Sequence, residues 1–362
     1  MPHIDWLVQT YGVPLGVAGF AVSCVMLPGA LAGWSFGVLS DRYGAKRVAI
    51  AGLLLAAAAS VAGAFAQTFF LLALLRIVEG VGYTLLVVAA TVLAVAVVPG
   101  RSAIALSVWS SFAPIGFALG QWAASYAANP PLRVIGLVHA CALAVAAIAL
   151  HFSIAEPPGR GGPRTSARDV LRHAPAQFTA LAFGGVCAVL IAAVALAPLV
   201  LAANSGITVA HAASLTALAA LPSIVGRIAP GWLLERGFAA FTVFAAASAV
   251  AGLSLASALA PLPLALALLS FGCFQIIAGA LPALLSAMLP HVAPTPAQLG
   301  TVSGMCSQSV NIGNLIGPPL ALAIYAAAGT TVALLTLVFL LAVSVVAIAR
   351  LGVFRRDLRP AA

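Results

Sequence analysis

Three charged side chains lie within long apolar stretches of this 362-residue chain, namely Arg76, Glu79 and Arg227. At the centre of a lipid bilayer each would cost about 2.5–3.5 kcal/mol on insertion scales, so each needs a partner or a wet cavity. Glu79 follows Arg76 by three positions, a helical spacing at which an ion pair can form. Two arginines against one carboxylate leave an excess of positive charge, which favours anions over cations.

Each of these residues has two interpretations. Arg76 and Glu79 either neutralise each other for folding, or Arg76 attracts an anionic group while Glu79 serves as its counter-ion and proton acceptor. Arg227 either contacts a substrate or extends its guanidinium to the membrane surface. Four neutral side chains either line a cavity or form hydrogen bonds between helices, and these are Gln275, Gln308, Asn311 and Asn314. Two further polar residues, His139 and His151, are expected to pack or cap rather than to move protons.

The composition indicates an integral membrane protein. Hydrophobic residues make up 63% of the chain and charged residues 6%, whereas roughly 45–50% of a soluble protein is apolar. The net charge of +9 lies at the ends of apolar segments rather than in a stripe, so nucleic-acid binding is not expected. The five cysteines show no metal-ligand spacing, and no nucleotide-binding glycine loop is present, so neither an enzyme nor a cofactor is predicted.

Apolar runs of about 20 residues predict eleven membrane spans. Their approximate bounds are 12–38, 48–66, 69–98, 104–127, 132–154, 176–203, 209–233, 239–260, 262–289, 298–328 and 330–350. The polar, Pro- and Gly-rich stretch 156–175 separates an N-terminal bundle, 1–155, from a C-terminal bundle with a short tail, 176–362.

Basic residues predict the orientation. Of the 16 Lys and Arg residues, only Arg133 falls in a loop on the side opposite to the loop around Asp41, and Arg76 and Arg227 fall within spans. The positive-inside rule therefore places the Asp41 loop and the carboxyl terminus in the cytoplasm.

Short matches recur between the two halves in the same order. The segment from Gly37 to Arg42 aligns with the segment from Gly231 to Arg236, and Leu75–Gly80 aligns with Phe274–Gly279. This pattern indicates duplicated bundles. The second half begins with a span whose counterpart in the first half is incomplete, so we expect a first helix to be missing or to lie upstream of Met1.

The loop from Gly37 to Arg47 (GVLSDRYGAKR) resembles the signature loop of the major facilitator superfamily, between that family's second and third helices. The segment from Arg76 to Gly82 resembles the family's R-x-x-x-G-x-G motif in the fourth helix. Arg227 and Gly231 are similar to an R-x-x-x-G pattern in its monocarboxylate-type branches. The resemblance spans nearly the whole chain.

The resemblance implies an all-α membrane protein with a two-bundle fold of 11 transmembrane helices (5 + 6), related by a pseudo-twofold axis, that works by alternating access. It also implies that Asp41 locks the cytoplasmic side, and we expect it to meet the N-terminus of the helix beginning near Gln298–Gly300. The gate residues expected on this basis are Gly37, Asp41, Arg42, Gly44, Lys46 and Arg47, with Glu235 and Arg236 in the second half; Lys46 and Arg47 also anchor the topology.

The function predicted from the sequence is secondary active transport of a small organic anion, with proton coupling or exchange. The expected partners are membrane lipid, the small-molecule substrate and protons, in a monomer of the bacterial inner membrane. One alternative is a proton-driven exporter of drugs or apolar compounds. The other is a non-transporting, truncated remnant or membrane scaffold.

Overall fold

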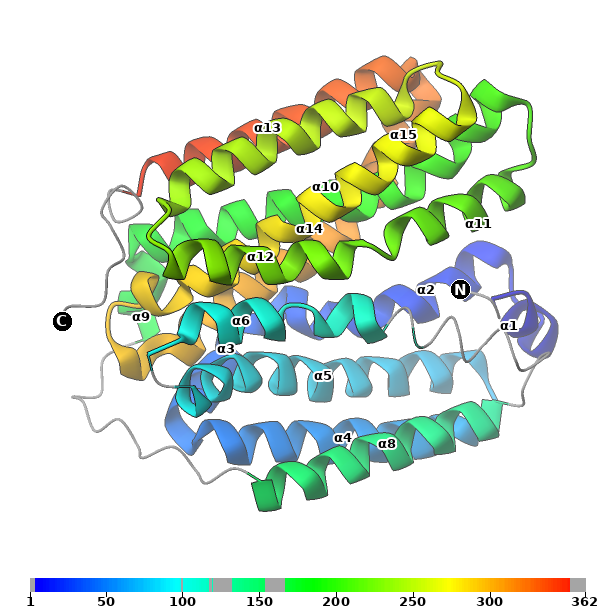
Figure 1. The fold of residues 1–362 in the computed structure, drawn as a ribbon. Helices are drawn as coiled ribbons and strands as arrows, with labels where there is room; N and C mark the ends of the chain where they lie inside the picture. Colours follow the sequence, from blue (N-terminus) through cyan, green and yellow to red (C-terminus); the bar gives the residue numbers. More distant parts are fainter. Residues whose placement is uncertain (1–3, 99, 117–118, 120–131, 154–166, 352–362) are drawn as a thin grey trace. The chain divides into compact units, whose positions relative to one another are not determined.

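The computed structural model describes the chain except for residues 1–3, 99, 117–118, 120–131, 154–166 and 352–362. The described residues form long helices joined by short turns (Figure 1), as the apolar runs predict. They divide into two compact units: unit 1 contains Met1–Val97, Gly116–Val170 and Thr295–Asn311, and unit 2 contains Val98–Ile115, Leu171–Pro294 and Ile312–Ala362.

Unit 1 is built from the N-terminal helices and the start of the last long helix. Its elements are α1 (Ile4–Tyr11), α2 (Leu15–Ser23), η1 (Cys24–Met26), α3 (Leu27–Tyr43), α4 (Ala45–Ala64), α5 (Phe69–Val97), α8 (Leu132–Ser153), η2 (Pro296–Gln298) and the first turns of α15 (Leu299–Ala349). Helix α4 packs against both α5 and α8, and α3 packs against α5. A Cβ atom on Gly52 would lie 2.6 Å from the carbonyl oxygen of Gly82, so α4 and α5 approach to backbone contact.

Unit 2 is organised around α14 (Leu264–Val292), which packs against α6, α10, α11, α12 and α13. The other elements are α6 (Ser102–Trp109), α10 (Ala174–Ser205), α11 (Val209–Ala220), α12 (Ser223–Glu235), α13 (Ala240–Leu259) and the remainder of α15, with the short α9 (Ala167–Arg172) before α10. The contact units differ from the bundles expected from the sequence, because α6 packs against α12 and η2 packs against α3. The division at the 156–175 linker therefore stays a prediction.

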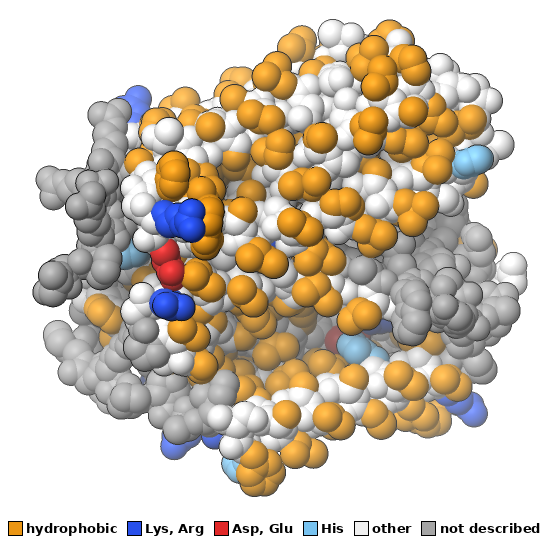
Figure 2. Space-filling view, in the orientation of Figure 1, with side chains coloured by type: hydrophobic (Ala, Val, Ile, Leu, Met, Phe, Trp, Pro, Cys, Tyr) orange, Lys and Arg blue, Asp and Glu red, His pale blue; other side chains and the backbone are white. Residues whose placement is uncertain are grey.

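Nine helices of the described residues are long and apolar enough to span a membrane. The last of them, Pro296–Ala349, contains the last two predicted spans, and Gly329 separates them with a φ of +80°. The predicted span 104–127 is described only in part, as the apolar stretch Ser102–Gly116. The membrane assignment is confirmed, whereas the count of eleven stays a prediction. Figure 2 shows a largely apolar face, with most visible Lys and Arg side chains toward the helix ends.

The first predicted span, 12–38, is broken rather than continuous. Its residues form α2, the 3-10 turn η1 and α3, and Ala32 departs from helical geometry with φ −136° and ψ 20°. Pro28 lies in the first turn of α3, where its missing amide is tolerated. The break brings the η1 backbone close to α5, which positions the site described below.

The two repeated segments make the same kind of close helix contact, one in unit 1 and the other in unit 2. A Cβ atom on Gly37 would collide with Gly300 O and lie 2.6 Å from Thr301 Cα. In the other copy, a Cβ atom on Gly231 would lie 2.8 Å from Ala103 O and 2.7 Å from Ile104 Cα. The repeat seen in the sequence is thus matched by repeated local geometry.

Candidate functional site

Arg76 and Glu79 form an ion pair on α5, where the two residues lie about one helical turn apart. Arg76 Nη1 donates to Glu79 Oε2 at 2.8 Å, which confirms the pairing predicted from their spacing. The Arg76 side chain is 37% exposed, whereas that of Glu79 is 7% exposed. The carboxylate is therefore enclosed while the guanidinium remains accessible.

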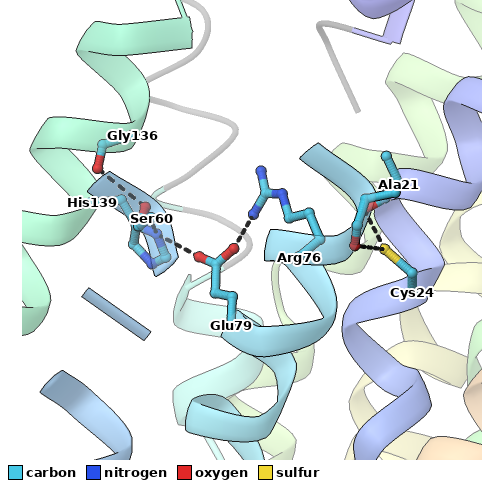
Figure 3. Close-up of polar contacts among 8 residues, drawn as sticks. Ala21, Cys24, Ser60, Arg76, Glu79, Gly136 and His139 are labelled. Atoms are coloured by element: carbon cyan, nitrogen blue, oxygen red, sulfur yellow. Dashed lines mark hydrogen bonds and ion pairs between the residues drawn. The ribbon is translucent and has the colours of Figure 1, made fainter. Parts of the chain in front are cut away.

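A third ionisable group, His139 of α8, completes this cluster (Figure 3). Its Nδ1 lies 3.0 Å from Glu79 Oε1 and 3.2 Å from Ser60 Oγ of α4. This contact is not predicted by the sequence, from which His139 is expected to pack or cap. The signal was an ionisable side chain inside an apolar span, which by default indicates a functional site.

The hydrogen bonds around His139 assign its tautomer. Ser60 Oγ donates to Gly136 O at 3.1 Å, so the serine oxygen is left to accept. An ionised Glu79 carboxylate can only accept. Both neighbours of His139 Nδ1 are then acceptors, which favours the tautomer that carries its proton on Nδ1.

A cavity of about 190 Å³ within unit 1 adjoins the cluster. Its polar lining consists of Arg76, Glu79, Tyr83 and His139, and its other walls are apolar side chains and glycines of η1, α4, α5 and α8. This volume is enough for several waters, at about 30 Å³ each, or a small organic ion. Apolar walls strengthen the electrostatic interactions of the charges inside.

Glycines of the R-x-x-x-G-x-G motif explain how the cluster is held. A Cβ atom on Gly80 would collide with Val25 O of η1, and one on Gly82 would lie 2.7 Å from Ala56 N of α4. The motif therefore lets two neighbouring segments approach α5 directly beside Arg76 and Glu79. Cys24 links η1 to α5, because its thiol donates to Ala73 O at 3.6 Å.

The second polar site in unit 1 is the contact of Asp41 with the start of α15, which we call the Asp41 latch. Gly300 N donates to Asp41 Oδ1 at 2.8 Å, while Thr301 N and Thr301 Oγ1 donate to Asp41 Oδ2 at 2.7 and 2.6 Å. The carboxylate thus binds the amides that a helix N-terminus leaves unpaired and faces the positive end of its dipole. The contact of Asp41 with this helix start agrees with the expectation from the sequence, and its role as a gate stays a prediction.

Glycines allow α3 and α15 to meet at the latch. A Cβ atom on Gly33 would lie 2.7 Å from Gly304 O, and one on Gly304 would collide with Gly33 O. Deeper along the same contact, Gln308 Oε1 accepts from Trp34 N at 3.4 Å and its Nε2 donates to Leu31 O at 3.3 Å. Gln308 therefore satisfies backbone groups on both sides of the kink in α3.

The other gate residues of the first half serve the turn and its flanks. Gly44 ends α3 and begins α4 with φ +95° and ψ 136°, a conformation that favours glycine. Lys46 Nζ donates to His151 O at 2.7 Å, near the end of α8. Arg42 lies over the ring of Tyr43, and Arg47 is exposed. The role of Lys46 and Arg47 in anchoring the topology stays a prediction.

In unit 2, Arg227 of α12 lies against the end of α6. Its Nη1 donates to Ser110 O at 2.8 Å, where the helical stretch Ser102–Gly116 is interrupted, and its buried Nε has no hydrogen-bond partner among the described residues. A cation at a helix carboxyl end is favourable. The guanidinium thus contacts protein backbone rather than extending to the surface.

The remaining predicted residues are dispersed. Gln275 and Asn311 are buried, and Asn311 Nδ2 donates to Ser307 O at 2.8 Å. Asn314 Oδ1 is buried and without a partner in the described part of the chain. Arg236 stacks over Trp232 at 3.5 Å from the ring centroid, and Glu235 is exposed.

Within unit 1, then, the structure joins Arg76 to Glu79 and His139, and Asp41 to α15. Among the described residues, no group of three or more His, Cys, Asp or Glu side chains is arranged to hold a metal ion. The polar contacts that the structure shows in unit 1 are charge pairs and hydrogen bonds inside an apolar helical scaffold.

Solved structures with this fold are transporters. The human organic anion transporter MFSD10 matches with a TM-score of 0.74 and 18% identity, over 95% of this chain and 88% of its own. A fucose:proton symporter of E. coli matches with a TM-score of 0.74 and 19% identity, over 96% and 92%. The proton:xylose symporter XylE matches with a TM-score of 0.71 and 11% identity, over 97% and 90%.

Curated protein sequences gave no significant match. The sequence profile of the Major Facilitator Superfamily matches residues 1–291. With the fold, the profile and the structural neighbours in agreement, this integral membrane protein belongs to the Major Facilitator Superfamily of transporters.

Proposed function

We propose that this transporter moves a small organic anion, using a proton gradient or exchange of one anion for another. The observation that carries the proposal is the Arg76–Glu79 pair, in which an accessible guanidinium and an enclosed carboxylate line the same cavity. Arginine offers five N–H donors in a planar fork that matches a carboxylate. A substrate carboxylate can therefore use the accessible side of Arg76.

The duplicated scaffold supports a functional role for this charge. The positions that match Arg76 and Glu79 in the second half hold Gln275 and Ala278, both buried. The packing there is retained, since a Cβ atom on Gly279 would lie 3.0 Å from Ser223 O, as Gly80 meets Val25 O in the first half. This helix crossing therefore forms without charge, which favours a task in transport for the pair.

The names of the structural neighbours are consistent with the proposal. One is described as an organic anion transporter and two as proton symporters. At 11–19% identity, these similarities carry the fold rather than the substrate. The choice of an anion therefore rests on the residues of this chain.

The remaining assignments complete the proposal. Arg227, Gln275, Gln308, Asn311 and Asn314 are further candidates for substrate binding or coupling. The Asp41 latch and its loop form the conformational gate, with Glu235 and Arg236 as its second copy. In this proposal the helices span the inner membrane of a bacterial cell, and the basic loops indicate that the carboxyl terminus is cytoplasmic. The 156–175 linker separates the N-terminal bundle from the C-terminal bundle in the sequence.

Transport in proteoliposomes tests this function. The purified protein is reconstituted into proteoliposomes that are loaded with unlabelled lactate, succinate or gluconate, and counterflow of the same labelled anion is measured. A parallel series uses a lipophilic cation, tetraphenylphosphonium. We expect counterflow of at least one anion and its loss in Arg76→Gln. Arg133→Gln is the matched control, because Arg133 lies over the Phe65 ring outside the cavity.

Three results would reject the proposal or replace it. Cation transport that is insensitive to Arg76→Gln would favour the exporter. Counterflow of the anion that survives Arg76→Gln would remove Arg76 from the site. Absence of all transport by a correctly folded chain would favour a membrane scaffold.

A further inference from the structure

We propose that His139 is the proton-binding residue of this transporter and that it couples one proton to one negative charge of the substrate. The inference rests on the proposed anion transport and adds the identity of the proton carrier and the stoichiometry. It starts from the contact of His139 Nδ1 with Glu79 Oε1 at 3.0 Å.

Glu79 is shared between two partners. Its Oε2 accepts from Arg76 Nη1 at 2.8 Å, and its Oε1 faces His139. With the histidine neutral, Arg76 and Glu79 balance each other and the cluster carries no net charge. When Nε2 takes a proton, the imidazolium becomes a second cation on the same carboxylate, and the cluster carries one net positive charge.

Binding of an anion completes a neutral arrangement. A substrate carboxylate pairs with Arg76, while Glu79 pairs with protonated His139. The loaded cluster then holds two cations and two anions, so the cost of enclosing it in the apolar cavity is lower than for either ion alone. Neither the proton alone nor the anion alone gives this balance, and this is the physical origin of the coupling.

The exposure of the three side chains fits this division of roles. His139 and Arg76 both line the cavity, and their side chains are 48% and 37% exposed, whereas that of Glu79 is 7% exposed. Ser60 Oγ, the other acceptor at His139 Nδ1, holds the ring in place. The enclosed carboxylate therefore joins two accessible cations.

The other ionisable groups around the cluster do not change this charge count. Tyr83 of α5 lines the same cavity. The Cys24 thiol of η1 donates to Ala21 O and Ala73 O, which commits its proton to carbonyl groups. Arg133, earlier on α8, lies over the Phe65 ring at 5.4 Å from its centroid. Helix α4 presents only the hydroxyl of Ser60 to the histidine.

Proton-driven accumulation tests the proposal separately from transport itself. Proteoliposomes at internal pH 7.5 are placed at external pH 6.5, and uptake of the labelled monoanion gluconate is compared with its counterflow at equal pH. Coupling of one proton to one monoanion predicts about tenfold accumulation for this gradient, since each tenfold ratio corresponds to about 1.4 kcal/mol. A potassium diffusion potential should leave the ratio unchanged, because the loaded cluster is neutral.

The variant His139→Gln keeps a donor for Glu79 and removes the titrating group. We expect both accumulation and counterflow of gluconate to fall, because glutamine imitates the neutral histidine and the anion-loaded cluster would then carry one net negative charge. His151→Gln, on the same helix and outside the cavity, should behave as wild type. Accumulation by His139→Gln equal to that of wild type would overturn the proposal. If the wild-type protein shows no counterflow with gluconate, the same pair of measurements uses lactate or succinate. Absence of counterflow with all three would instead refute anion transport.

A measurement on the wild-type protein keeps the test valid if His139→Gln does not fold. Addition of the transported anion to weakly buffered, detergent-purified protein at pH 7.5 should take up a proton, detected with a soluble pH dye. The uptake should approach one proton per bound monoanion and vanish in Arg76→Gln. Anion binding without proton uptake would overturn the assignment of His139.

Discussion

The Asp41 latch offers a direct test of how one carboxylate holds two helices together. Its three hydrogen bonds, at 2.6–2.8 Å, come from Gly300 and Thr301. A hydrogen bond to a charged group contributes about 1.5–3 kcal/mol, and a carboxylate at a partly buried helix N-terminus gains up to about 2 kcal/mol from the dipole. The three bonds share one partly exposed carboxylate, so we expect Asp41→Ala to weaken the contact by about 2–3 kcal/mol.

Hydrogen exchange can measure this weakening at the residues concerned. A loss of about 2–3 kcal/mol in local opening energy corresponds to roughly 30- to 150-fold faster exchange. We expect this acceleration in peptides that contain the Gly300 and Thr301 amides. Peptides from the centre of α14 should keep their exchange rates.

Two control variants separate the latch from general effects of charge. Arg47→Gln changes an exposed charge in the same loop, and Glu235→Gln changes the matching carboxylate of the second copy, which is also exposed. Neither should accelerate exchange at Gly300 by more than about fivefold, since exposed charges contribute about 0–1 kcal/mol. Unchanged exchange in Asp41→Ala would refute the reasoning, because the carboxylate would then contribute nothing to the helix start.

Three further predictions concern backbone geometry and the unit 2 arginine. Gly37→Ala should lower the melting temperature of the purified protein markedly, because the added Cβ collides with Gly300 O, whereas Gly252→Ala should be tolerated because its Cβ meets only Val338 Cγ2 at 3.9 Å. Gly44→Ala should destabilise the protein by about 1–3 kcal/mol through its positive φ, measured by the same thermal unfolding. Arg227→Gln should lower the melting temperature, because it removes the hydrogen bond to Ser110 O. If the transported anion also binds at Arg227, the same variant should raise the anion concentration for half-maximal counterflow at least tenfold. An unchanged concentration would restrict Arg227 to a structural role.

The sequence was most informative where a local pattern specified both partners of a contact. Arg76 and Glu79 stand on one helix, so their spacing alone predicted the ion pair. The Asp41 contact was expected from the resemblance of the Gly37–Arg47 loop to the family's signature loop, together with a helix start after Pro294 and Pro296. The approximate bounds predicted for the last two spans, 298–328 and 330–350, leave residue 329 between them, and Gly329 has a φ of +80° in the structure.

Features that depend on the rotation of one helix against another could not be predicted. His139 meets Glu79 only because α8 and α5 present particular faces to the cavity, and no local pattern specifies those faces. The break at Cys24–Met26 and the kink at Ala32 are also tertiary, since Gln308 of α15 satisfies backbone groups beside the kink. Pro28 alone did not indicate the break, because proline is accepted in the first turn of a continuous helix.

The two copies of the repeat also differ in a way that bears on gating. Both place a glycine of one helix against the first turn of another, at Gly37 and at Gly231. Among the described residues, Asp41 accepts three hydrogen bonds from a helix start, whereas Glu235 of the second copy accepts none. Glycine packing brings the helices together in both units, but the electrostatic contribution differs. A change that must break these contacts is therefore opposed more strongly at α15 than at α6, and protonation of Asp41 would remove much of that difference.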